Sequence, residues 1–598
     1  MHFPIKHHSY LSDQCIKFQS LPTFKKLLPK NIKALHIQKT YIGGEVPDPS
    51  YLHYVKRLKR VKTLTLSPSS FRSRSKFRKA SENLFLVKSL RKSLEFLSQE
   101  SFFNRNCHKN LFKLSKIELE LAQTESYQVL PFHRHLKQIS FPLENCHSST
   151  KISAAKKLFE NYKARFKRSL SRLRDLAMLR INGSGEELKL TTNLLKLFQE
   201  VPGLIPNLEV FILHIDGGTT DSFSSKNFAN LPALNLLSCL PYVTSFSLKD
   251  SHLEMLIFNL SQLRNVQALN LTVKSNNMNQ LSYLKTFHEL KYLKLKAKLD
   301  SKKTEREFFE VFTLPSSLVS VDLTLQGWMW EDCQKPTRKN SDKLNNSIQK
   351  EKHFYAQWKG LKDLKHLKLK VQNWWLTHSE VDKNFAINIV RHLKGLESCI
   401  FTQSHDKALG STLELRELFE ALKNSRNTIK ILNISASNMN FVEDFSPQSF
   451  ELLKLKEFSL KGSALSSPNT AQFFNNLSVK PWQPIKVIWR SLEVHNIKTL
   501  EAVLKSLTLL PKTVELDLKL DICLLAKENW LEILRQAIIK MRFEAKVHLT
   551  LLTKSDISGK NALKEIEVAA LANPRFEGLF IESRFDKRIY HIFSRGSQ

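Results

Sequence analysis

The sequence predicts an α/β protein in which short parallel strands alternate with helices along a solenoid. Three observations lead to this fold class. A six-residue motif recurs along most of the chain, with apolar residues at its first, fourth and sixth positions. The copies follow one another at a nearly constant distance, and the segments between them have helical periodicity.

The last two apolar positions of the motif are two residues apart, which is the alternation of a β-strand with one buried face. The early clear copies are Ile32/Leu35/Ile37, Val61/Leu64/Leu66, Leu114/Ile117/Leu119, Leu136/Ile139/Phe141 and Leu176/Leu179/Ile181. The central copies are Leu208/Phe211/Leu213, Val243/Phe246/Leu248, Val266/Leu269/Leu271, Leu290/Leu293/Leu295 and Leu318/Val321/Leu323. From residue 367 onward the middle apolar positions are 367, 399, 432, 458, 488, 516, 549 and 579.

Helices are expected between these strands. The segment 412–424 places Leu415, Leu418, Phe419 and Leu422 on one face of a helix. The segment 528–541 does the same with Leu531, Leu534, Ile538 and Met541. An ordinary α/β protein with many short strands is the alternative, and the near-constant repeat disfavours it.

The L-x-x-L-x-L element resembles the leucine-rich-repeat family, and its long, ribonuclease-inhibitor-like kind in particular. The resemblance extends from about residue 32 to residue 585. It implies roughly 17–19 repeats in a horseshoe with a parallel concave sheet and outer helices. The family's turn Asn or Cys is replaced here, chiefly by Ser, Thr and Asp, which also bond turns locally.

This interpretation divides the chain into five parts. They are an N-terminal cap or extension (1–31), basic N-terminal repeats (32–180), central repeats (181–326), an inserted polar loop (327–360), and C-terminal repeats with a cap (361–598).

The charge of the chain is unevenly distributed. The 598 residues have a formal net charge of +36, and residues 1–180 contain 36 Lys and Arg against 12 Asp and Glu. No apolar run has the length of a transmembrane span, no signal-peptide core is present, and the seven cysteines are scattered. A cytoplasmic location is therefore expected, with a nuclear one as the alternative because KRLK (56–59) is a loose nuclear-localisation pattern.

No motif indicates catalysis. The sequence contains no P-loop, G-x-G-x-x-G, H-E-x-x-H or G-x-S-x-G pattern. We therefore expect a protein that is not an enzyme and has no catalytic residues, no cofactor and no metal site.

The outward positions of the strands form the first candidate surface. They are mostly small and polar, with a concentration of lysines at Lys249, Lys294, Lys296, Lys368 and Lys370 that flanks Asp322. Trp374 and Trp375 follow one of these strands and are candidate interface anchors. These seven residues predict a site for an acidic protein partner, although lysine is abundant in this chain and a parallel sheet needs a soluble face.

Two basic clusters form the second candidate surface. The loop 67–79 carries Arg72, Arg74, Lys76, Arg78 and Lys79. The amphipathic segment 151–174 carries Lys163, Arg165, Lys167 and Arg168 beside an apolar face. Such clusters attract nucleic acid, anionic lipid or acidic protein. The competing interpretation of the second cluster is an ordinary repeat helix whose apolar face packs on the sheet.

Together these features predict a scaffold or adaptor that binds protein partners through the concave face. One alternative is a protein that binds nucleic acid or an anionic surface through the basic N-terminal third. Another is a substrate adaptor of a ubiquitin ligase, which the absence of an F-box-like segment in residues 1–30 disfavours.

Overall fold

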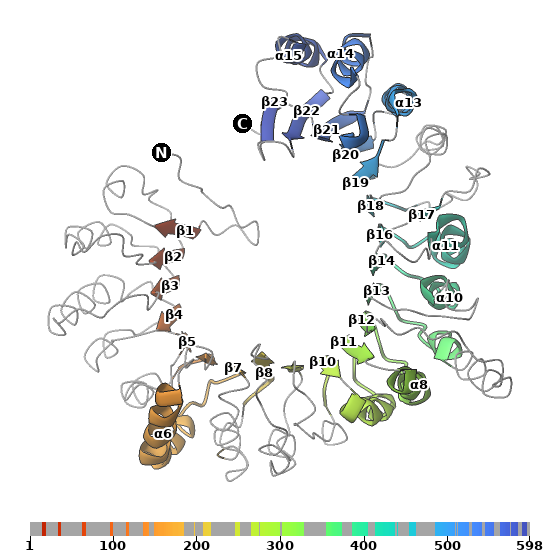
Figure 1. The fold of residues 1–598 in the computed structure, drawn as a ribbon. Coiled ribbons are helices and arrows are strands. Elements are labelled where there is room, and N and C mark those ends of the chain that lie inside the picture. The colour runs from red at the N-terminus through yellow and green to blue at the C-terminus, as the bar shows by residue number, and fades with distance from the viewer. Residues whose placement is uncertain are drawn as a thin grey trace, which may run out of the picture. The chain divides into compact units, whose positions relative to one another are not determined.

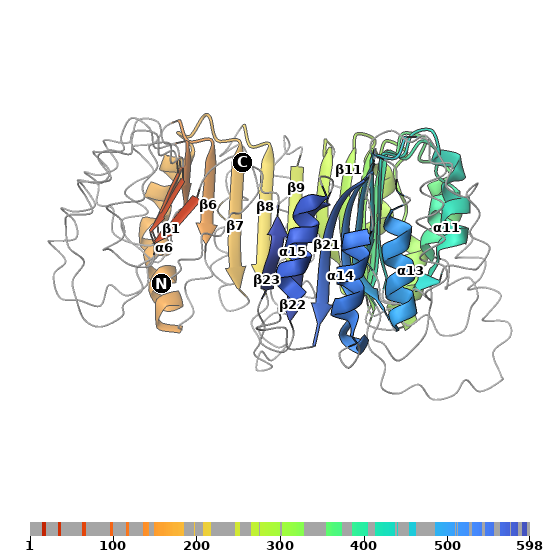
Figure 2. The same ribbon diagram turned by 90° about the horizontal axis from the view of Figure 1, so that it is seen from above.

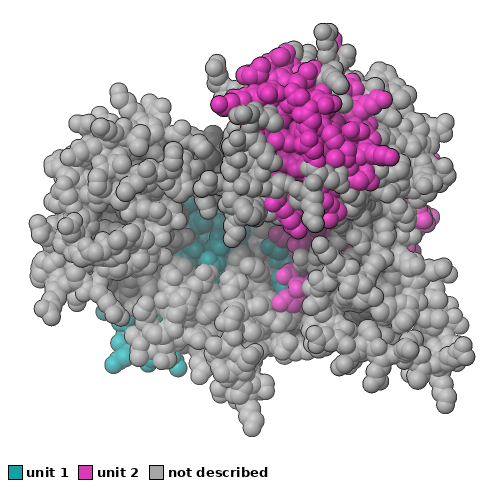
Figure 3. Space-filling view, turned by 45° about the horizontal axis from the view of Figure 1, so that its top comes forward, with its two compact units in different colours: residues 1–272 teal, residues 273–598 magenta. Residues whose placement is uncertain are grey.

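A computed structural model describes parts of the chain between residues 15 and 594. The described residues are 15–18, 34–37, 63–66, 96–99, 115–118, 135–142, 149–184, 197, 207–216, 245–250, 265–273, 275–299, 302–327, 354–372, 385–404, 413–436, 439–440, 454–461, 485–494, 496–508, 510, 512, 514–525, 529–540, 545–554, 562–573, 576–583 and 589–594. The chain divides into two compact units, Met1–Thr272 and Val273–Gln598, coloured separately in Figure 3.

Unit 1 contains a parallel sheet in which each strand pairs with the next along the chain. Its strands are β1 (Cys15–Phe18), β2 (Ala34–Ile37), β3 (Thr63–Leu66), β4 (Phe96–Gln99), β5 (Lys116–Glu118), β6 (Gln138–Pro142), β7 (Met178–Ser184), β8 (Val210–Asp216), β9 (Ser245–Asp250) and β10 (Ala268–Val273), which ends one residue past the boundary. The helix α6 (Ser149–Leu170) connects β6 to β7.

Unit 2 continues this pattern, again with successive strands paired in parallel. Its strands are β11 (Tyr292–Leu299), β12 (Ser320–Gly327), β13 (His366–Gln372), β14 (Ser398–Ser404), β16 (Ile431–Ala436), β18 (Glu457–Lys461), β19 (Ile485–Glu493), β20 (Val514–Asp521), β21 (Lys546–Thr553) and β22 (Phe576–Ser583). The last strand, β23 (Ile589–Ser594), is antiparallel to β22. A small separate pair joins β15 (Leu413–Glu414) to β17 (Met439–Asn440).

The described helices of unit 2 lie on one face of its sheet, as Figures 1 and 2 show. They are η7 (Ser275–Thr286), α8 (Lys302–Val311), α10 (Phe385–Arg391), α11 (Leu415–Leu422), η9 (Lys423–Ser425), α13 (Ile497–Leu507), η11 (Cys523–Leu525), α14 (Trp530–Lys540) and α15 (Ala562–Ala572), together with a short helix at 354–358. The chain is therefore an α/β protein with a long parallel sheet and helices between its strands, as the sequence predicts.

Side-chain alternation determines which face of each strand is buried. In β11, Leu293, Leu295 and Ala297 are buried, whereas the lysines between them point to the other face. The apolar faces of α11 and α14 are buried as predicted, with Leu418 and Leu534 fully inaccessible to solvent. The core therefore lies between the sheet and the helices.

The predicted alternation is wrong by one residue in β19. Val487 and Trp489 are buried, whereas Ile488 is half-buried and points outward. Val487 pairs with Phe458 on β18 and with Leu516 on β20. All three consecutive residues are apolar, so periodicity alone does not determine which of them face the core.

Aromatic rings fill the core beside the predicted insertion at 327–360. The ring of Phe354, from the helix 354–358, lies 4.9 Å from that of Phe309 and 5.7 Å from that of Phe312. Phe354 and Trp358 are fully buried. The aromatic end of this segment therefore belongs to the core of unit 2.

Candidate partner-binding face

The register of β11, β12 and β13 brings the predicted lysines of unit 2 together. Lys294 pairs with Asp322, which pairs with Lys368. One step along the strands, Lys296 pairs with Thr324 and Thr324 with Lys370. Since neighbouring strands are about 4.8 Å apart, the predicted grouping of Lys294, Lys296, Lys368 and Lys370 around Asp322 follows directly from the sheet. We call these four lysines the lysine cluster.

One charge of the lysine cluster is compensated. Lys368 Nζ donates a hydrogen bond to Asp322 Oδ2 at 3.0 Å, and both side chains remain partly exposed. Lys294, Lys296 and Lys370 form no ion pair with any residue that the structure describes. Three cations of the cluster are therefore not compensated by any described residue, and they lie on the face that the described helices do not cover (Figure 1).

Sequence reasoning missed a further lysine on this face. Lys298 continues the alternation of β11 past Lys296 and is half-buried. The repeat motif contains only two outward positions, and Lys298 lies beyond them. The continued Lys-x-Lys-x-Lys spacing was the available signal.

Apolar and aromatic residues accompany the lysine cluster. Ile400 on β14 pairs directly with Lys368. Tyr292 at the start of β11 is 53% exposed, and Ile431 at the start of β16 is 37% exposed. This face therefore combines cations with exposed apolar groups, a mixture that suits a protein partner better than a bare polyanion.

The lysine cluster as defined here does not include three predicted residues of this site. The backbone of Lys249 lies in β9 of unit 1, whereas the cluster belongs to unit 2, and the side chain of Lys249 is outside the described residues. Trp374 and Trp375 also lie outside the described residues. Their roles stay predictions.

The basic helix of unit 1 packs as a repeat helix. Ala155, Phe159 and Phe166 are buried, and the ring of Phe166 lies 5.8 Å from that of Phe141 on β6. The helix ends at Leu170, four residues before the predicted end. Beyond it, the amides of Arg172 and Leu173 bond three residues back, to Ser169 O at 3.2 Å and to Leu170 O at 3.0 Å.

The cations of α6 lie around this buried face. Arg165 and Arg168 are exposed, while Lys163 and Lys167 are half-buried. Anion binding by these four residues stays a prediction. The other predicted anion-binding residues, Arg72, Arg74, Lys76, Arg78 and Lys79, lie outside the described residues.

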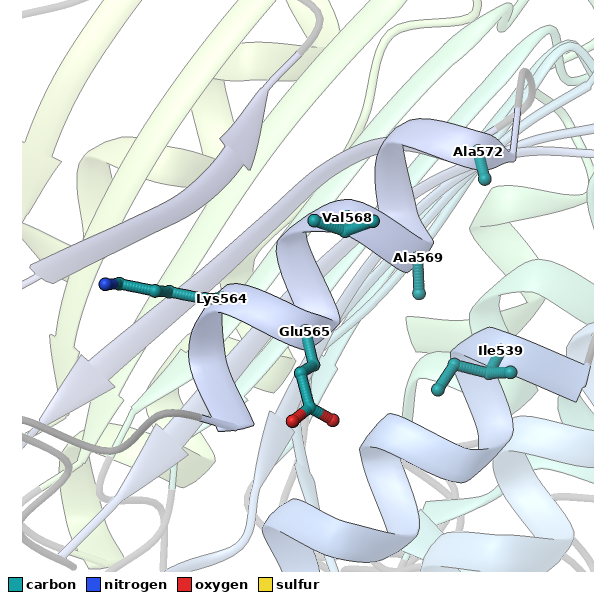
Figure 4. Close-up of a pocket in the computed structure, with 6 residues that line it drawn as sticks. All are labelled: Ile539, Lys564, Glu565, Val568, Ala569 and Ala572. Carbon is teal, nitrogen blue, oxygen red and sulfur yellow. The ribbon is translucent and has the colours of Figure 1, made fainter.

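A shallow groove of about 520 Å³ lies between α14 and α15 (Figure 4). Its walls are mostly apolar, and Ile539 and Val568 are more than half exposed. Of its two charged lining residues, Lys564 extends away from α14, and Glu565 accepts a hydrogen bond from Arg535 at 2.6 Å. The groove therefore lacks the converging polar groups that fix a small substrate.

Neither a metal centre nor a membrane span is found in the described part of the chain. No three or more of its His, Cys, Asp or Glu side chains are grouped so that they could hold a metal ion. Among the same residues, no helix combines the length and the apolar character needed to cross a membrane.

No protein-family model matches the chain, and no curated protein matches it in sequence. Among solved structures, it is similar to the leucine-rich-repeat ectodomain of the plant membrane receptor kinase GASSHO1/SCHENGEN3 from Arabidopsis thaliana, in complex with CASPARIAN STRIP INTEGRITY FACTOR 2. The sequence identity is 13% and the TM-score 0.27. The match covers 90% of this chain and 62% of the ectodomain, so this chain spans less than two thirds of that protein's length.

Proposed function

We propose that the chain is a leucine-rich-repeat-like solenoid that acts as a protein-interaction scaffold, and that its binding face is the outward face of β11–β14. The single observation that carries the proposal is the register that gathers Lys294, Lys296 and Lys370 around the Lys368–Asp322 pair. Repeated strand–helix units build extended surfaces that usually bind partners.

The composition of this face indicates the kind of partner. The lysine cluster favours an acidic segment, because complementary charges steer association and suppress wrong partners. Tyr292, Ile400 and Ile431 add apolar area at the edges of the cluster. The preferred partner is therefore a protein segment with acidic residues beside at least one large apolar residue.

The experiment is a selection from a random peptide library on the immobilised full chain. The test variant is Lys296→Glu/Lys370→Glu, which reverses two uncompensated charges of the cluster. The control is Lys498→Glu/Lys564→Glu, which makes the same charge change at exposed positions on the helices α13 and α15. We expect the selected peptides to be acidic and to contain an apolar residue. They should bind the control variant as tightly as wild type. Their affinity for the test variant should be at least tenfold lower, a loss of about 1.4 kcal/mol in binding free energy.

Two results would contradict the proposal. One is a selected set of peptides without acidic enrichment. The other is equal loss of peptide binding in both variants, since this would mean that net charge alone, and not the β11–β14 face, determines binding.

A further inference from the structure

The turns that lead into β13, β14, β16 and β18 are strongly basic. These turns are residues 359–365, 391–397, 423–430 and 454–456, and we call them the basic turn edge. They contain ten Lys and Arg residues but only two acidic residues, Asp363 and Glu397. The turn before β12 (313–319) contains no charged residue, so the basic character begins at β13.

Backbone hydrogen bonds place the four turns directly beside one another. The amide of Glu397 donates to Lys365 O at 2.7 Å, that of Lys430 to Glu397 O at 2.8 Å, and that of Lys456 to Lys430 O at 2.8 Å. Side chains join the middle two turns. Thr428 Oγ1 donates to Leu396 O at 2.8 Å, and Asn424 Nδ2 donates to Arg391 O at 3.0 Å. The cations are therefore carried by an ordered edge of the sheet.

Most of this positive charge is uncompensated within the described part of the chain. Glu397 bonds Lys430 at 2.6 Å and lies 3.5 Å from Lys365, and Glu420 on α11 forms an ion pair with Lys423. Lys362, Lys394 and Lys456 are exposed and form no ion pair with any described residue. The pKa of His392, in the same edge, is lowered by burial and then by the charges of Arg391 and Lys359.

Helix dipoles account for only a minority of these cations. A cation in the last turn of a helix interacts favourably with its C-terminal dipole, and the effect fades beyond that turn. Arg391 ends α10 and Lys423 directly follows α11. Lys362 and Lys394 lie four and three residues beyond the ends of the preceding helices, at 358 and Arg391, and Lys456 directly precedes β18.

The apolar residues of these turns distinguish between classes of partner. Leu361, Leu364, Leu393, Leu396 and Leu455 are all buried, so the edge offers no apolar anchor. Protein interfaces use apolar and aromatic anchors, and peripheral membrane binding also needs apolar insertion. Nucleic-acid interfaces are strongly positive and polar.

We propose that the basic turn edge binds the sugar–phosphate backbone of a nucleic-acid duplex, without reading its sequence. Consecutive turns are roughly 5 Å apart along the sheet, and each strand of a duplex carries one phosphate per about 3.4 Å of axis, so the spacing of the turns is compatible with contacts to different phosphates. The turns 359–365, 391–397, 423–430 and 454–456 contain no aromatic residue of the Phe, Tyr or Trp type on which unpaired bases would stack.

The deciding experiment measures lysine acetylation at single sites in the full chain, with and without a duplex of arbitrary sequence. Mass spectrometry compares Lys362, Lys394 and Lys456 with Lys498, Lys554 and Lys564. The second group is also exposed but lies at helix starts or past a strand end, away from the basic turn edge. We expect several-fold slower acetylation of the first group when the duplex is bound, and little change in the second.

A second measurement follows binding of the same duplex as a function of salt. In Lys362→Glu/Lys394→Glu/Lys456→Glu, the slope of log K against log salt is expected to fall by about three relative to Lys498→Glu/Lys554→Glu/Lys564→Glu. Equal protection of both lysine groups, or no protection, would overturn the proposal. Equal or stronger protection of the edge by phosphatidylserine vesicles or poly-glutamate would overturn the assignment to nucleic acid.

Discussion

Lys368 on β13 donates a hydrogen bond to Asp322 on the neighbouring strand β12 at 3.0 Å. The pair lies between Lys294 on one side and Ile400 on the other, because the four residues are in register across β11–β14. Asp322 is thus the residue that limits the positive charge of the lysine cluster. Its side chain is 21% exposed and that of Lys368 45% exposed, so the pair remains accessible to a ligand.

Replacing this carboxylate is expected to change binding more than stability. Asp322→Asn should alter the free energy of unfolding by less than about 1 kcal/mol, because exposed ion pairs contribute little. It should tighten the binding of a short poly-glutamate peptide, because the attraction of the cluster is no longer offset. Isothermal titration calorimetry measures whether the peptide affinity rises. Repeating it at a second salt concentration tests whether the increase is electrostatic. Unchanged or weaker binding would show that the peptide does not contact this cluster.

The aromatic cluster of unit 2 gives a prediction about stability. Phe354 is fully buried among the rings of Phe308, Phe309 and Phe312. Phe354→Ala should lower the free energy of unfolding by about 3–5 kcal/mol, since it removes a large buried side chain and leaves a cavity. Urea unfolding followed by circular dichroism measures the loss. The exposed Tyr292→Ala is the control, expected within about 0.5 kcal/mol of wild type.

The faces of most strands are predictable from the sequence because two-residue alternation decides which side chains meet the core. Alternation alone therefore assigns Lys294 and Lys368 to the same face of the sheet. The same rule fails at Ile488, where three apolar residues in a row fit either register. A run of adjacent apolar residues does not show which of them face the core. Only the pairing of β19 with β18 and β20 determines this.

The basic turn edge could not be found by periodicity. Lys362 and Lys394 each lie five residues before the middle apolar position of their repeat, whereas Lys456 lies two residues before position 458, so no single repeat position carries all three. They become neighbours only because the hydrogen bonds of Lys365, Glu397 and Lys430 align the turns. Charge clustering across repeats is therefore a property of the register, whereas charge clustering within 67–79 is visible in the sequence.

The turn before β14 depends on a glycine. Gly395 has φ +82°, a conformation that side chains disfavour, and no atom lies within 4 Å of where a Cβ would be placed. Gly395→Ala should therefore destabilise the chain by about 1 kcal/mol through backbone strain alone. Gly395→Asn should cost less, because asparagine tolerates this conformation better. Urea unfolding of both variants tests this order, and equal stability of the alanine variant and wild type would refute it.

Arg535 joins α14 to α15 and gives a prediction about pH. It bonds Glu532 and Glu565, each at 2.6 Å. The hydrogen bond from Arg535, followed by that from Gln536, lowers the pKa of Glu532 from 4.5 to about 2. Because this pKa is lower in the folded state, the stabilisation is present above pH 4.5 and is lost as the pH falls through about 2.

The variant Arg535→Gln should therefore unfold more easily than wild type at pH 7. The difference should shrink progressively below pH 4.5, as protonation removes the same interaction from wild type. Urea midpoints between about pH 7 and about pH 3 measure this convergence. The matched control is Lys423→Gln, which removes the exposed i,i+3 ion pair between Lys423 and Glu420. A stability difference that stays constant with pH would argue against an electrostatic origin.

The thiol of Cys399 reports on the opening of the core of unit 2. It lies at an inward position of β14, 1% exposed, and burial raises its pKa to about 12. Iodoacetamide reacts with the thiolate, so the folded chain should leave Cys399 unmodified at about pH 8. Cys523, which is half-exposed, is the internal comparison and should react faster. Mass spectrometry after labelling in increasing urea should show that Cys399 is modified only when the chain unfolds. Rapid labelling of Cys399 in the absence of urea would instead mean that β14 opens locally, before the rest of the sheet.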